Sequence, residues 1–196
     1  MITASFAKPV GLFDNWFNKV VSRITGGEFC HSEFIVSWDC KTAERFFEQV
    51  EGHARLKGRY LNYVEDDLIH ICFYVLWGHA ITYRLLKKNH NNPFFRVPNN
   101  IQYACVDIDA SEEEEMTMAK FLIDQCAKPY DTVGALTFFI PLRQSAHEYE
   151  TYFCSQLMVC AMQQINRMTH VNAASLTPNS LYKLLVGSRQ VATSRV

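Results

Sequence analysis

The sequence predicts a single domain over residues 1–187, in which helices at both ends of the chain surround a sheet formed by its middle. Apolar residues recur at helical spacing in residues 12–24 and again in residues 154–168. Between these segments lie short runs rich in β-branched and aromatic residues, each bounded by turn-forming residues. A chain of 196 residues is long enough to bury a core as one domain. Residues 188–196 are expected to be a flexible tail.

The first elements follow from local spacing. Residues 12–24 place seven apolar side chains on one helical face, and Gly26-Gly27 ends the helix. Residues 33–38 are β-prone and predict a strand. Asp39-Cys40-Lys41 has the composition of a hairpin turn and leads to residues 45–48, which we expect to form the next strand.

The middle and the end of the chain continue the mixed pattern. Strands are predicted at residues 68–77, 80–86 and 103–108, with an Asn- and Pro-rich loop at 89–100. Ser111, followed by four glutamates, has the composition of a helix start. A loop-rich passage through Pro141 leads to the apolar helix that begins at Cys154, and a short helix is expected at 180–186.

Composition limits the functional class. With 48% hydrophobic residues, 20% charged residues and a net charge of −1, the chain is neither basic enough for a general nucleic-acid binder nor polar enough for disorder. Its longest apolar runs, such as residues 71–77, are too short to span a bilayer. Seven cysteines without a CxxC pair, and no leading signal peptide, indicate free thiols in a reducing, cytoplasmic compartment, and no metal or other cofactor is expected.

Two residues have the contexts of a catalytic couple. His31 stands at the start of an apolar strand, and Cys154 stands in the first turn of an apolar helix. A thiolate nucleophile needs an imidazole as base, and a helix amino terminus lowers a thiol pKa. Each residue also has a structural reading, since a histidine before a strand is often structural and a helical cysteine such as Cys160 is usually a small hydrophobe. Found together, they favour a thiol hydrolase.

Several short sequence motifs in the chain resemble those of one family. The chain is similar to the circularly permuted branch of the NlpC-type papain-like hydrolases, especially its YiiX-like and viral members. In that branch the histidine strand precedes the cysteine helix, as His31 precedes Cys154 here. The similarity covers residues 12–186 and rests on the words CHSEFIVSW, RFFEQVEGHARLKG, CAKPYDTVGAL and YFCSQL, followed by SLTPNSLYKLL.

The resemblance implies an α+β fold, in which an antiparallel sheet packs on the helix that carries the nucleophilic cysteine. It implies that Cys154 is the nucleophile, that His31 is the base and that Glu48 orients the imidazole. Glu33 is a rival for the third role, because at i+2 it shares a strand face with His31, and Glu44 is a further candidate. Residues 80–100 look like an insertion that serves as a lid or a partner surface.

Tyr130-Asp131 matches the family word that precedes the cysteine helix. These two residues are expected to be architectural, with polar groups that can line the cleft, and Glu33 is the other expected substrate-side residue.

The function implied is a cysteine hydrolase that works through an acyl-enzyme. Amide, isopeptide, thioester and ester substrates all suit that chemistry, as peptides or as acyl lipids, and the apolar first helix is compatible with contact at a membrane surface. Nucleic acid is not expected as a partner. Two other readings stay open: a non-enzymatic structural or interaction protein of viral origin that keeps the fold, and a zinc-binding protein.

Overall fold

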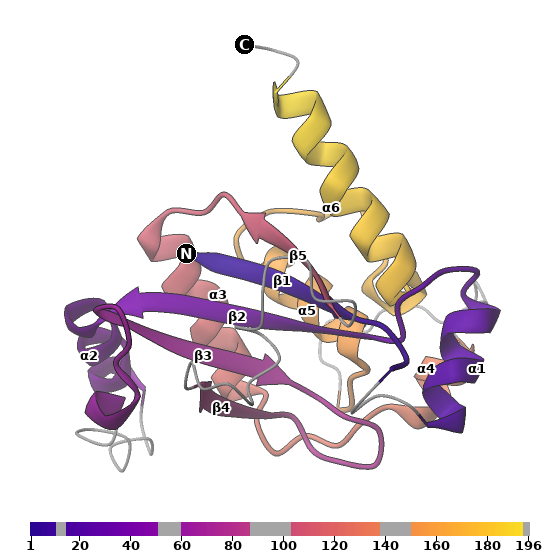
Figure 1. The fold of residues 1–196 in the computed structure, drawn as a ribbon, viewed down its shortest axis with the longest axis horizontal. Helices are drawn as coiled ribbons and strands as arrows, with labels where there is room; N and C mark the ends of the chain where they lie inside the picture. Colours follow the sequence, from indigo (N-terminus) through magenta and orange to yellow (C-terminus); the bar gives the residue numbers. More distant parts are fainter. Residues whose placement is uncertain (11–14, 51–59, 87–102, 138–149, 194–196) are drawn as a thin grey trace.

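A computed structural model describes residues 1–10, 15–50, 60–86, 103–137 and 150–193. In these residues the chain forms a five-stranded antiparallel sheet of order β4-β3-β2-β1-β5, with helices around it (Figure 1). The expected α+β class is therefore confirmed. The strands are β1 (Ile2–Ala7), β2 (His31–Asp39), β3 (Leu68–Tyr74), β4 (Thr82–Leu86) and β5 (Tyr103–Ile108).

Strand β1 is the element that sequence analysis missed. It pairs with β2 on one side, with Ala7 opposite His31, and with β5 on the other. Every residue of β1 except Thr3 is buried, and Ile2, Ala4 and Phe6 belong to the main core. The strand has only six residues, and its two Ala and one Ser positions give little of the β-branched and aromatic signal by which strands are recognised.

The helices gather on one face and at the two ends of the sheet (Figure 1). Helix α5 packs on β2, and α3 packs on α5, so the core lies between these two helices and the sheet. The helices are α1 (Trp16–Ile24), α2 (Cys40–Gln49), α3 (Glu112–Asp124), α4 (Thr132–Thr137), α5 (Cys154–Gln163) and α6 (Pro178–Thr193), with 3-10 turns at Tyr60–Tyr63 and Ala173–Ser175.

Two predicted helix starts are confirmed. Ser111 caps α3: its hydroxyl accepts the Glu114 N–H at 3.2 Å, and the Glu114 carboxylate accepts the Ser111 N–H at 2.8 Å. Helix α5 begins at Cys154 as expected, but it ends at Gln163. The backbone turns to positive φ at Asn166 and Met168, which breaks the apolar stripe that the sequence carries onward.

The predicted hairpin after β2 is wrong, because residues 40–49 form helix α2. Asp39 is the cap of this helix rather than a turn residue, and its side chain accepts the Thr42 N–H at 2.8 Å. The buried residues that follow recur at i, i+3, i+4 and i+7, which is helical spacing. They are Ala43, Phe46, Phe47 and Val50.

Two other boundaries differ from expectation. Helix α6 continues through Thr193, so the tail predicted after residue 187 is wrong for residues 188–193. In the segment read as an insertion, residues 82–86 form β4 as an edge strand of the sheet, and residues 87–100 lie outside the described part. Helix α1 begins at Trp16 behind an Asn15 cap, while the first residues predicted for it, 12–14, also lie outside that part.

Candidate active site

The structure brings His31 and Cys154 together at one end of the sheet. His31 is the first residue of β2, and Cys154 is the first residue of α5, which lies against β2. Their side chains lie close enough for each to shift the pKa of the other. Both residues are almost completely buried, with exposed fractions of 4% and 5%. Two elements that meet in the core thus hold the pair from opposite sides.

The electrostatics of the pair favour charge separation. Burial raises the pKa of the Cys154 thiol, but the neighbouring His31 outweighs this effect, and the pKa is below its ordinary value. Burial lowers the pKa of His31, but its contacts with Cys154 and Glu33 raise it to about 9. Both shifts favour transfer of the thiol proton to the imidazole.

Ser32 is a site residue that sequence analysis missed. It lies close enough to the Cys154 thiol to help lower its pKa. The residue follows His31 at the start of β2, next to the amino terminus of α5. The only signal in the sequence was its place beside His31.

Glu33 lies beside the imidazole. Its Oε2 is 3.6 Å from Nε2 of His31, slightly longer than a hydrogen bond, so it acts on the ring mainly through its charge. The same oxygen accepts a hydrogen bond from the Cys72 thiol at 3.4 Å. Glu33 is 3% exposed, so this charge acts in a medium that screens it weakly.

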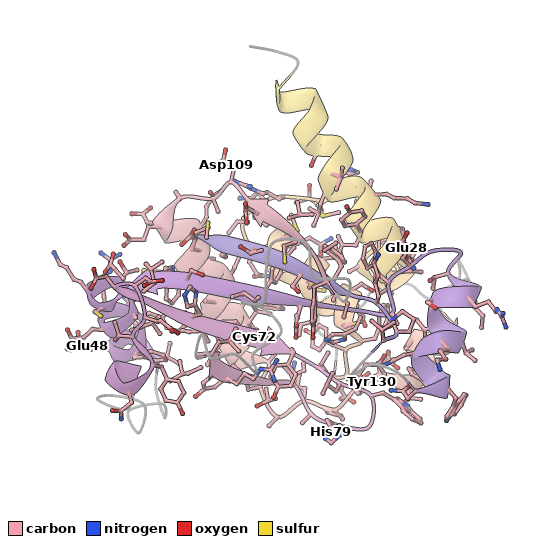
Figure 2. All side chains as sticks on the ribbon, in the orientation of Figure 1. Glu28, Glu48, Cys72, His79, Asp109 and Tyr130 are labelled. Carbon is pink, nitrogen blue, oxygen red and sulfur yellow. The ribbon has the colours of Figure 1, made fainter. Side chains whose placement is uncertain are left out.

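The expectation that Glu48 orients His31 is wrong. Glu48 is an exposed residue of α2, which follows the far end of β2, and Glu44 is exposed on the same helix. Strand β2 rises about 3.3 Å per residue, so its two ends lie roughly 26 Å apart. Figure 2 shows Glu48 and Tyr130 at opposite ends of the sheet. The prediction failed because it depended on residues 45–48 forming a strand.

Tyr130 and Asp131 both lie close to the pair, in different roles. The Asp131 carboxylate accepts the Gly134 N–H at 2.7 Å at the start of α4, and its backbone N–H donates to the Tyr152 carbonyl at 2.9 Å. It therefore fixes the chain that approaches Cys154. Tyr130 lines the cavities at the pair, and burial, together with the nearby Cys154, raises its pKa well above the usual value.

Two cavities lie at the pair. One of about 180 Å³ is lined by His31, by Phe17 of α1 and by Trp77 of the β3–β4 connection. The other, of about 20 Å³, is lined by Cys154 and has room for about one water molecule. Cys30 and Tyr130 line both cavities, which makes them the boundary between the outer cleft and the thiol.

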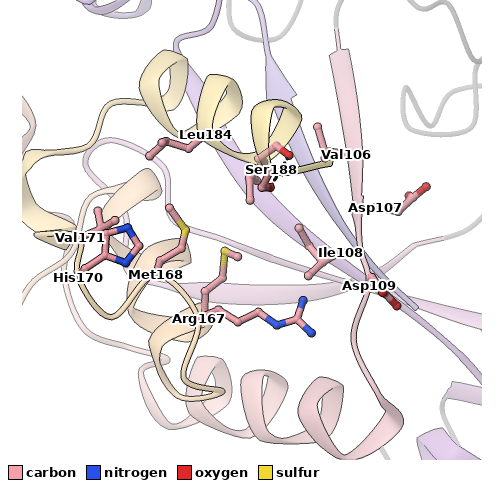
Figure 3. Close-up of a pocket in the computed structure, with 12 residues that line it drawn as sticks. Val106, Asp107, Ile108, Asp109, Arg167, Met168, His170, Val171, Leu184 and Ser188 are labelled. Atoms are coloured by element: carbon pink, nitrogen blue, oxygen red, sulfur yellow. Dashed lines mark hydrogen bonds between the residues drawn. The ribbon is translucent and has the colours of Figure 1, made fainter. Parts of the chain in front are cut away.

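A larger cavity lies elsewhere (Figure 3). It has a volume of about 510 Å³ and is formed by β5, the far end of α5 and α6. Met162 lines it from α5, eight residues beyond Cys154, and eight helical residues span about 12 Å. Its lining is mostly apolar, with Arg167 and His170 among the polar members. It is separate from the histidine–cysteine pair.

The described residues hold no group of three or more His, Cys, Asp or Glu side chains suited to a metal ion. All seven cysteines are free. Within the same ranges, no helix has the length and apolar character needed to cross a bilayer. Comparison with protein-family models, curated proteins and solved structures gave no match.

Proposed function

We propose that this chain is a thiol hydrolase in which Cys154 is the nucleophile, His31 is the general base and acid, and Glu33 is the residue that positions and charges the imidazole. The observation that carries the proposal is the meeting of His31, at the start of β2, with Cys154, at the amino terminus of α5, in one buried place. There the pKa of Cys154 is lowered and that of His31 is raised. Perturbed pKa values of this kind are typical of catalytic nucleophiles and bases.

The reaction begins with the proton of the Cys154 thiol on His31. The thiolate attacks the carbonyl carbon of a substrate, and the carbonyl electron pair moves to oxygen to give a tetrahedral oxyanion. The Cys154 N–H, at the amino terminus of α5, is a donor for that oxyanion. The intermediate collapses to an acyl-enzyme while His31 gives its proton to the leaving amine, alcohol or thiol.

Water then completes the cycle. The imidazole removes a proton from a water molecule, which attacks the acyl carbon, and the second tetrahedral intermediate releases the carboxylic acid and the Cys154 thiolate. The cavity of about 20 Å³ at Cys154 is large enough for that water. It is too small for a substrate acyl group, so the site has to open when substrate binds.

The resemblance to circularly permuted papain-like hydrolases is part of the same proposal. In its support, β2 with His31 precedes α5 with Cys154, and an antiparallel sheet packs on the helix whose amino terminus holds the thiol. Ester, thioester, amide and isopeptide carbonyls all suit this arrangement. A non-enzymatic role is less consistent with it, because burying a titrating thiol beside an imidazole adds nothing to packing that an apolar residue could not supply.

Acylation of the chain by an activated ester tests the proposal. Intact mass spectrometry should show one acyl group on the wild-type chain within the first turnover, localised by peptide mapping to Cys154. The Cys154→Ala chain should remain unmodified, and His31→Ala should acylate far more slowly. Cys160→Ala is the matched control, since Cys160 lies on the same helix and should not matter. Equal acylation of the wild-type and Cys154→Ala chains would refute the proposal.

A further inference from the structure

Exposed apolar side chains lie beside the cleft, at the end of the molecule that holds the site. Three of them, Trp16, Val20 and Ile24, are on α1, with exposed fractions of 67%, 36% and 58%. The fourth, Trp77, is 42% exposed in the connection between β3 and β4. The Trp16 and Trp77 rings are 6.0 Å apart. We call these four residues the aromatic rim, and an apolar patch of this kind on a monomer usually marks an interaction site.

The rim is held in place by packing beneath it. The Phe17 ring is 3% exposed and stacks on Trp77 at 4.5 Å, with an interplanar angle of 9°. Phe17 and Trp77 also line the outer cavity that contains His31. The rim is therefore continuous with the mouth of the candidate active site.

The exposed face of α1 combines apolar and cationic side chains. At about 100° per residue, Trp16, Val20 and Ile24 cover an arc of roughly 80°, and Arg23 and Lys19 come next to Trp16 on its other side. All five residues are exposed, and Trp16–Ile24 contains no carboxylate. An apolar stripe with tryptophan, bordered by Lys and Arg, is typical of helices that lie in the interface of an anionic membrane.

We propose that the aromatic rim docks on the surface of an anionic lipid bilayer, with Lys19 and Arg23 at the phosphate level and the cleft mouth facing the membrane. We choose an anionic bilayer as the partner because the positive charges of Lys19 and Arg23 suit anionic headgroups. The consequence for substrate rests on the proposed function: the enzyme would take acyl esters of membrane lipids, whose carbonyl groups lie at the depth of the interface. Docking itself does not depend on catalysis.

Sedimentation with vesicles tests the docking. The wild-type chain should bind vesicles of phosphatidylcholine with 30% phosphatidylserine and bind pure phosphatidylcholine vesicles weakly. Tryptophan emission should move to shorter wavelength on binding, because Trp16 and Trp77 are exposed while Trp38, the remaining tryptophan, is buried. Arg23→Gln should reduce affinity for the anionic vesicles about fivefold.

Matched variants separate the rim from general hydrophobicity. The double variant Trp16→Ser, Ile24→Ser should lose binding by at least tenfold, whereas Leu184→Ser should keep it, since Leu184 is 44% exposed but lies on α6. Neither Trp16 nor Ile24 lines the described cavities at the site, so the double variant should hydrolyse a soluble short-chain ester at the wild-type rate. It should hydrolyse a vesicle-embedded acyl ester more slowly.

Three results would overturn the docking proposal. The first is that the wild-type chain binds neither kind of vesicle. The second is that Leu184→Ser loses as much binding as the double variant. The third is that ultracentrifugation shows a dimer that the double variant abolishes, because a second copy of the chain would then cover the rim. Cys154→Ala separates the two proposals. If it binds vesicles like the wild type while no chain hydrolyses either ester, docking stands and the hydrolase proposal fails.

Discussion

Replacing Glu33 by glutamine removes the negative charge 3.6 Å from Nε2 of His31 and leaves a side chain of nearly the same size in a buried position. At an effective dielectric constant of ~20, two unit charges at that distance attract by about 4.6 kcal/mol, which is an upper limit. Opposite charges this close typically change a pKa by about 1 to 3. The pKa of His31, now about 9, should therefore fall to roughly 6–8.

The sign of the effect on rate follows from the charge pair. Acylation should rise with pH as the thiolate forms and fall as His31 loses the proton that it gives to the leaving group, at about pH 9 in the wild type. Glu33→Gln should move this alkaline limb to lower pH. With a pKa near 7, the imidazolium fraction at pH 8 drops from about nine-tenths to about one-tenth, so acylation should slow about tenfold.

The assay is the pH dependence of Cys154 acylation by an activated ester in single-turnover conditions. Glu48→Gln is the control, because Glu48 is exposed on α2 at the far end of β2, and its profile should match the wild type. Circular dichroism at each pH should show that both variants stay folded. An alkaline limb that stays near pH 9 in Glu33→Gln would refute the role given to this carboxylate.

Three further outcomes are expected. Iodoacetamide at pH 7 should label Cys154 before Cys160, whose pKa burial raises to about 12; equal rates by peptide mass spectrometry would contradict the lowered pKa of Cys154. Asn179→Ala should lower the free energy of unfolding in urea by about 1–3 kcal/mol. The reason is that the Asn179 side chain accepts a hydrogen bond from the Phe29 N–H at 2.9 Å and donates one to the Phe29 C=O at 2.8 Å. An unchanged urea midpoint would contradict this prediction. Ser111→Ala should cost about 1 kcal/mol through loss of the α3 cap and leave acylation unchanged.

The central pair could be predicted from the sequence because each partner carries a local signal. A histidine before an apolar run and a cysteine that opens an apolar stripe both mark element termini, and the structure places them there. The capping box at Ser111 was equally local.

The third residue could not be chosen from the sequence alone. Asp39 suits both a turn and a helix cap, and that ambiguity decided whether Glu48 would stand on a neighbouring strand or leave the site altogether. Glu33 was indicated only by strand alternation, which places residues i and i+2 on the same face. That geometric argument was more reliable than the sequence match to the family on which the choice of Glu48 depended. Strand β1 was missed because its importance lies in its partners, β2 and β5, which are distant in sequence.

The position of β2 in the sheet has a consequence for how the protein unfolds. This strand is the third of five, with paired neighbours on both sides and α5 against one face, so its amides should be among the slowest to exchange with deuterated solvent. Openings that expose them amount to global unfolding, whereas peripheral elements such as α1 can open at lower free energy. In rising denaturant, the enhanced reactivity of Cys154 should therefore persist until the cooperative transition and vanish with it.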